Sequence, residues 1–412
     1  MITILAHGAA ANGLPLPRWL LAYLLAFLAL LTALTLRATS PKTSVAETQA
    51  PVVSRPTPFE LTTSSLGLVL LLGTIFAGAT SLDDAGLFSY TVVVVVFWLG
   101  GQVLALAVGD WYRWLDPFVV LTALLPDRTS DAPSWTAPAM TASLLWFWLV
   151  FGERSPTNRE VAVFLALYTS AVVVGALLWG RAWVREGEGF AATFGLVGSL
   201  GLLRRAVPTR SLAARPVRRG TVALVAVYLG GVAFDGLSQT SWWVDVMGTR
   251  TGWSLRFVNT IGLAWTTTIV AVGVLAAARV IGAMTGTTTT VLADRLAKSV
   301  VPIALGCWIA HELPTLVIDG QNFYGLVSDP LARGWDLFGT IDVLPNYTLL
   351  TPSEQGWVGT VALTLGALAA AAVAHEAVFA SFAPRVAVRA VWPITIALMA
   401  ALVGAGLLLL GT

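Results

Sequence analysis

The sequence predicts an all-α membrane protein: a polytopic bundle of about ten transmembrane helices with two short interfacial or re-entrant helices. Hydrophobic residues make up 57% of the 412-residue chain and charged residues only 11%, whereas soluble domains carry about 25% charged residues. The mean hydropathy is +0.79. Apolar runs of about 20 residues, the length that crosses a bilayer as a helix, recur along the chain.

These runs define the predicted spans, which we assign to a single integral membrane domain over residues 1–412. Their ranges are 18–36, 61–79, 87–109, 134–151, 160–180, 221–237, 256–282, 299–318, 357–382 and 390–411. Two further apolar segments, 115–126 and 190–203, are too short to cross a bilayer. We expect them to lie at the interface or to re-enter the membrane.

The positions of Lys and Arg predict the orientation, because cytoplasmic loops of membrane proteins are enriched in these residues. An external N-terminus places most of the 24 basic residues on the cytoplasmic side. Segment 181–219 is then a basic cytoplasmic loop, 38–59 a cytoplasmic linker and 319–356 an acidic external loop. We therefore expect a multi-pass protein of the cell membrane with both termini external.

The partners expected from this composition are the lipid bilayer and a small apolar substrate or ion. The arginines of segment 181–219 are interpreted as topology determinants beside an anionic leaflet, and no nucleic acid is expected. The sequence has no P-loop, no dinucleotide-binding fingerprint and no HExxH motif. Nucleotide-driven and zincin-type chemistry therefore have no support.

Ionisable residues inside the predicted spans mark candidate sites, because such residues are costly in a bilayer and usually functional. The chain has three histidines: His7 before the first span, His311 in the eighth and His375 in the ninth. A helical rise of about 1.5 Å per residue places His311 and Asp235 in one outer layer, within reach of the tail that carries His7. We expect His7, Asp235 and His311 to hold a divalent transition metal such as zinc, with an open position for a water of lowered pKa.

The ninth span carries the second His–Glu pair at a different depth. His375 falls roughly 27 Å from the outer end of its span, too deep to share a metal with His311. We therefore predict that His375 and Glu376 assist Asp235 in catalysis as base or supporting residues; in the alternative, Asp235, His311, His375 and Asp110 form the stations of a proton pathway. Glu312 and Glu376 each project about 100° away from the adjacent histidine, so each either orients a ligand on another helix or pairs with an arginine.

Three residues near the outer ends of spans are predicted to bind substrate. Asp319 and Gln321 follow the eighth span in "VIDGQ". Trp242 lies in "SWWVDVMGTRTGW", residues 241–253, which we interpret either as part of the interfacial tryptophan belt or as an external lid that excludes water from an apolar pocket.

Five segments, spread from the first span to the ninth, resemble a family of prokaryotic membrane proteins labelled fenitrothion hydrolase. They are "AHGAAANGLPLPRWL" (6–20), "FAATFGLVGSLGLL" (190–203), "GTVALVAVYLGGVAFDGLSQTSWW" (220–243), "AHELPTLVIDGQ" (310–321) and "AHEAVFASF" (374–382). The resemblance implies hydrolysis of an organophosphate ester and implicates His7, Asp235, His311, Gln321 and His375. The chain departs from the family pattern after two of these histidines, where glutamates replace an aromatic residue and an aspartate.

Two functions follow as hypotheses. The first is a membrane-embedded hydrolase, with or without a metal, that acts on an apolar ester or phosphotriester at the outer face. The alternative is a transporter that moves protons, metal ions or solutes through buried His and Asp residues. A scaffold protein without small-molecule chemistry is a third possibility, for which loss of the histidines would have little effect.

Overall fold

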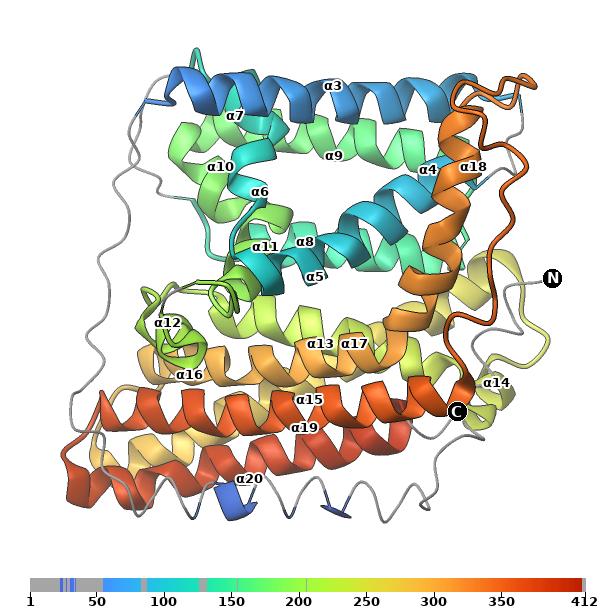
Figure 1. Cartoon of the computed structure of the whole chain (residues 1–412). Coiled ribbons are helices and arrows are strands. Elements are labelled where there is room, and N and C mark those ends of the chain that lie inside the picture. The colour runs from blue at the N-terminus through green and yellow to red at the C-terminus, as the bar shows by residue number, and fades with distance from the viewer. Residues whose placement is uncertain are drawn as a thin grey trace. The chain divides into compact units, whose positions relative to one another are not determined.

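The computed structural model describes residues 55–82, 87–125, 132–153, 155–204 and 206–409, with a few positions between 23 and 34. Every regular element in these ranges is a helix (Figure 1). Eight of the helices are long and apolar enough to cross a membrane. The predicted helical membrane fold is confirmed for this part of the chain.

The eight long helices coincide with eight of the predicted spans. Their bounds are Pro58–Thr80, Phe88–Val108, Asn158–Trp179, Thr221–Ser238, Gly252–Thr285, Thr289–Ser328, Pro352–Phe379 and Pro384–Gly404. The predicted span 134–151 is a shorter apolar helix, Thr136–Phe151, which ends in a π-helical segment. Most of the predicted span 18–36 lies outside the described residues.

Two predicted loops contain more helix than expected. The basic segment 181–219 includes α11 (Gly189–Gly198), which matches the short helix predicted at 190–203, and also α10 (Arg181–Gly187) and α12 (Pro208–Ala214), which were not predicted. The external loop was predicted from residue 319, but η5 (Asp319–Gln321) and α18 (Asn322–Ser328) continue the helical run there. The irregular part of that loop therefore begins at residue 329.

The chain forms two compact units. Unit 1 comprises residues 1–50, 204–313 and 351–412, and unit 2 comprises residues 51–203 and 314–350. The division falls inside α17 (Val301–Ile318), immediately before Pro314. Proline lacks the backbone N–H and clashes with the preceding turn, so the regular helical hydrogen bonding is interrupted at this point.

In unit 1, long helices lie side by side, with α12 at one end and α14 at the other (Figure 1). These helices are α13 (Thr221–Ser238), α15 (Gly252–Thr285), α16 (Thr289–Ala297) with η4 (Lys298–Val300), α17, α19 (Pro352–Phe379) and α20 (Pro384–Leu409); α14 is Ser241–Met247. Helices α17 and α19 approach closely at Gly306 and Gly366. A methyl group added to Gly306 would lie 2.7 Å from the Ala362 carbonyl oxygen.

Unit 2 pairs α3 (Pro58–Thr80) with α9 (Asn158–Trp179), which lie side by side in Figure 1. The other elements are α4 (Phe88–Tyr90), η2 (Thr91–Gly100), α5 (Gly101–Val108), α6 (Tyr112–Leu115), α7 (Pro117–Leu121), α8 (Thr136–Trp146), η3 (Phe147–Phe151), α10, α11, η5 and α18. Aromatic rings from η2, α6 and α11 pack edge to face in its core. Phe97, for example, lies 5.0 Å from Phe190 and 5.5 Å from Phe194 between ring centroids.

Candidate metal centre

Helix α13 carries Asp235 into the interior of unit 1, close to the end of the helix at Ser238. The preceding residue, Phe234, packs edge to face on Trp243 of α14, with ring centroids 5.8 Å apart. The Trp243 indole N–H donates to Asn259 Oδ1 of α15 at 3.0 Å. These contacts fix the end of α13, and Asp235 with it, against two neighbouring helices.

Helix α17 supplies the other two side chains, His311 and Glu312. Both residues precede Pro314, which cannot bond to the carbonyl of Ala310 four residues earlier. On the other side of His311, the glycine contacts between α17 and α19 hold the helix close to its neighbour. His311 and Glu312 thus lie on one helical turn. The helix before this turn packs closely on α19, and the backbone hydrogen bonding after it is interrupted at Pro314.

Asp235, His311 and Glu312 come together in the interior of unit 1. His311 Nε2 lies 3.1 Å from Asp235 Oδ2. One ligand atom from each of the three residues lies within 4.8 Å of the other two. The exposed fractions are 3% for Asp235, 8% for His311 and 3% for Glu312. The predicted proximity of Asp235 and His311 is therefore present, and Glu312 is an addition.

The carboxamide of Gln239 is the fourth polar group here. Gln239 Nε2 lies 2.9 Å from His311 Nε2 and 3.4 Å from the Asp235 backbone oxygen. A neutral imidazole nitrogen is either a donor or an acceptor. His311 Nε2 therefore either donates a hydrogen bond to Asp235 or accepts one from Gln239. Only in the accepting state does Nε2 carry a lone pair.

The donor chemistry of this group fits a divalent transition metal. Imidazole nitrogen and carboxylate oxygen are both common ligands of zinc and of the neighbouring metals. Asp235 and Glu312 bring two carboxylate groups into a buried setting, where the attraction between a carboxylate and a divalent cation is stronger than in water. The group can therefore hold a metal ion through three protein ligands.

The predicted partners His375 and Glu376 lie on α19 in the same unit but outside this group. His375 is buried and stacks on Phe379, with ring centroids 4.2 Å apart. Glu376 Oε1 accepts from Arg210 Nε of α12 at 3.2 Å. Of the two roles left open for Glu376, pairing with an arginine is the one present.

The predicted substrate-binding residues have separate positions. Trp242 is 54% exposed on α14 and packs against Trp243 and Trp265. Gln321 Oε1 accepts from the Asn346 amide at 2.9 Å in unit 2, where Asp319 is also found. His7 lies outside the residues that the structure describes. The roles proposed for these four side chains stay predictions.

A second buried acidic cluster, in unit 2, was not predicted from the sequence. Glu188 caps α11 by accepting from the amides of Phe190 and Ala191 at 2.9 and 2.6 Å, and it also accepts from the Tyr168 hydroxyl. Asp116 caps α7 through the Phe118 amide at 2.9 Å. The "DP" pair at the start of α7 is a helix-start signal that would have located one of these caps.

Burial controls the protonation of this cluster. It raises the pKa of Glu188 to about 7, although the bonds from Tyr168 and the backbone amides favour the ionised form. Burial, with the nearby charge of Glu188 as the next cause, raises the pKa of Asp116 to about 8. Both carboxyls therefore change protonation near neutral pH.

Comparisons with known proteins give this chain no relatives: no family model, curated protein or solved structure matches it. The assignment of function therefore depends on the residues and their geometry.

Proposed function

We propose that the protein is a membrane-embedded, metal-dependent hydrolase that acts on an apolar ester or phosphotriester at the outer face of the membrane. The observation that carries this proposal is the buried group of Asp235, His311 and Glu312, with ligand atoms within 4.8 Å of one another. A site with three protein ligands leaves a position for water, which is the usual arrangement of catalytic rather than structural zinc.

Each residue of the group has a distinct task in this proposal. His311 would donate its Nε2 lone pair to a metal, and Asp235 and Glu312 would supply oxygen ligands. Gln239 Nε2, which lies 2.9 Å from His311 Nε2, would have to give up this contact when the nitrogen binds a metal. When bound, the metal would polarise the ester and lower the pKa of water. The low exposure of all three side chains keeps competing water away and strengthens these electrostatic interactions.

The resemblance to the fenitrothion hydrolase family supports the choice of substrate class. Two of the resembling segments, 220–243 and 310–321, contain Asp235, His311 and Glu312. The apolar surroundings of the group suit an apolar ester better than a charged one, because a charged substrate would lose its hydration on entry.

The test combines metal content with ester hydrolysis. We would measure metal by mass spectrometry in the purified wild-type protein, in His311→Ala and in Glu312→Gln, with the exposed Asp245→Asn on α14 as the matched control. We expect about one metal per chain in wild type and control and a large loss in the other two variants. Hydrolysis of a nitrophenyl ester and of an aryl phosphotriester should fall in parallel. A wild-type protein that folds, binds no metal and hydrolyses neither compound would refute the proposal.

A second candidate function, translocation of protons or metal ions, is favoured by the other His–Glu pair of unit 1. Asp235 lies near the end of α13 that leads into α14, whereas Glu376 pairs with α12; α12 and α14 occupy opposite ends of the unit in Figure 1. Buried His and acidic residues spaced between two ends of a helical unit suit a relay. Proton or zinc flux into liposomes that His375→Gln abolishes, in a protein without esterase activity, would select this function.

A further inference from the structure

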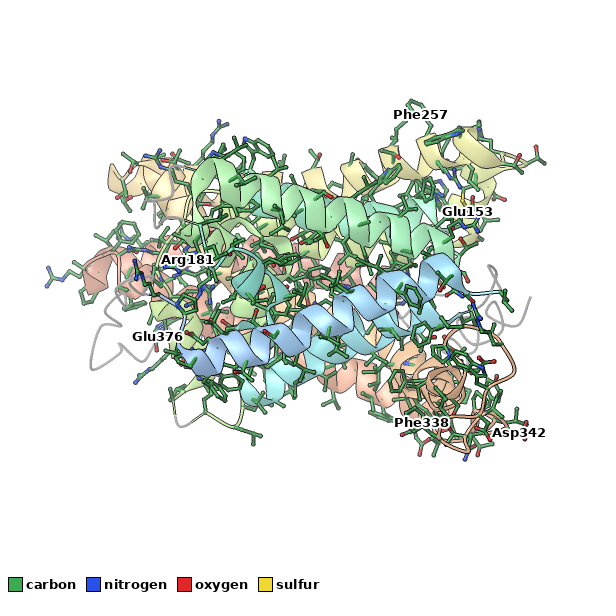
Figure 2. The ribbon with its side chains drawn as sticks, turned by 90° about the horizontal axis from the view of Figure 1, so that it is seen from above. Glu153, Arg181, Phe257, Phe338, Asp342 and Glu376 are labelled. Atoms are coloured by element: carbon green, nitrogen blue, oxygen red, sulfur yellow. The ribbon has the colours of Figure 1, made fainter. Side chains whose placement is uncertain are left out.

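The irregular segment 329–350 of unit 2 exposes an unusual amount of apolar surface. Eight of its large apolar side chains are from 40% to 85% exposed: Trp335, Leu337, Phe338, Ile341, Val343, Leu344, Tyr347 and Leu349. We call these eight residues the loop patch. Figure 2 shows Phe338, together with Asp342, on the outer edge of this segment. Single exposed apolar residues are normal, but a contiguous set marks an interaction surface.

Hydrogen bonds hold the backbone of the loop patch in place. Asp329 accepts from two successive amides, those of residues 333 and 334, at 2.8 and 2.7 Å. Asp336 accepts from the amides of residues 340 and 341 at 2.9 and 3.2 Å. Gln321 and Asn346 exchange two bonds across the base of the loop. The patch is thus exposed on an ordered backbone, which lowers the entropy lost when it binds a partner.

The loop patch continues the surface that unit 2 presents to lipid. The Leu82 amide, just past the end of α3, donates to the Leu331 carbonyl at 3.0 Å and ties the loop to that end of the span. Along α3, Leu72 and Phe76 are 52% and 61% exposed, as expected for a lipid-facing helix. Helix α18, which leads into the loop, lies across the long helices of unit 2 rather than along them (Figure 1). This is the direction of a helix in the plane of the membrane.

We propose that the loop patch inserts into the lipid headgroup region at this end of unit 2. Its irregular backbone cannot enter the hydrocarbon core, where unpaired amides and carbonyls are strongly unfavourable. Its tryptophan and tyrosine side chains are of the kind that concentrate in the interfacial layer. The segment carries Asp329, Asp336 and Asp342 against a single Arg333, so the patch binds zwitterionic lipid in preference to anionic lipid.

The test places a fluorescent reporter in the patch. Leu344→Cys would be labelled with an environment-sensitive dye in a Cys307→Ala background, which removes the one native cysteine. The labelled protein would be reconstituted into phosphatidylcholine nanodiscs that contain phospholipid spin-labelled near the headgroup. Phe76→Cys on α3 serves as the positive control for contact with lipid. We expect the spin label to quench the Leu344 dye about as strongly as the control dye, and aqueous iodide to quench it weakly.

Two further arms make the result specific. Phe338→Asp, a change at a position that is 65% exposed, should raise iodide quenching of the Leu344 dye without altering the thermal unfolding midpoint. Replacement of part of the phosphatidylcholine by phosphatidylglycerol should weaken quenching by the spin label; stronger quenching would overturn the stated lipid preference. A dye that iodide reaches freely in phosphatidylcholine would overturn the proposal, and shielding of that dye only in native membranes would assign the patch to a protein partner instead.

Discussion

The packing of α13 against α15 holds the candidate metal centre, and Gly230 is its most sensitive point. Gly230 lies five residues before Asp235 on α13 and accepts a hydrogen bond from Thr266 Oγ1 at 2.8 Å. A methyl group added at this glycine would lie 2.5 Å from the Thr267 Cα atom and 2.7 Å from its nitrogen. Small residues at such contacts let two membrane helices approach closely. We therefore expect Gly230→Ala to push α13 and α15 apart.

The magnitude follows from these distances. Carbon atoms pack best at about 3.5–4.0 Å, so the helices must separate by roughly 1 Å. Overpacking of this kind typically costs about 1–3 kcal/mol, and here the obstructing atoms belong to backbone that cannot rotate away. The higher helix propensity of alanine offsets up to about 1 kcal/mol of this. We expect a net loss of about 1–2 kcal/mol, which for a chain of 412 residues corresponds to a fall of about 1–2 °C in the unfolding midpoint.

The assay is thermal unfolding of purified protein in detergent, with Gly273→Ala as the matched control. Gly273 lies on α15, and a methyl group added there meets nothing within 4 Å. The control should therefore be neutral or slightly stabilising, since only the propensity difference of up to about 1 kcal/mol acts. Equal midpoints for the two variants would refute the reasoning. Metal content should also fall in Gly230→Ala alone, because Asp235 moves with α13.

Two other variants each test a feature within one of the two units. The raised pKa values of Glu188 and Asp116 mean that the folded state binds protons that the unfolded state has already released, so stability should fall as pH rises from about 5 to 8. Glu188→Gln should make stability depend less steeply on pH. An unchanged dependence would contradict the raised pKa of Glu188. Buried Lys298 donates to the carbonyls of Ala213 and Arg215 at 2.8 and 2.6 Å. Lys298→Met should therefore loosen the end of α12 and speed tryptic cleavage in that segment. Cleavage at the wild-type rate would mean that other contacts hold α12.

The sequence predicts the spans well because bilayer thickness sets their length directly. An apolar run near 20 residues long has few alternatives to a membrane-spanning helix. The predicted span 134–151 agrees with the helix Thr136–Phe151 to within two residues, although this helix is shorter than the eight candidate spans. Hydropathy did not indicate that its last five residues, Phe147–Phe151, form a π-helix.

The sequence could predict contacts in the candidate site only where the depth of a residue in the membrane was enough to place it. Counting residues along two spans placed Asp235 and His311 in one layer, and their side chains lie 3.1 Å apart. Glu312 was expected to point elsewhere, because adjacent residues differ by about 100° around a helix. That angle describes Cβ positions, whereas a glutamate carboxylate lies two carbons further out and can return toward its neighbour. The loop patch was beyond prediction, since its exposure depends on where the loop folds.

The two buried acidic clusters differ in the ligand atoms that they bring together, and this difference favours the cluster of unit 1 as the metal site. Glu188 accepts from two backbone amides and a tyrosine hydroxyl, so its oxygens already have donors and a proton is enough to neutralise it. Asp235 and Glu312 instead converge with the imidazole of His311. An imidazole nitrogen together with carboxylate oxygens is a ligand set that zinc and related metals commonly use. The same argument predicts that Glu188→Gln leaves the metal content unchanged, whereas Glu312→Gln lowers it.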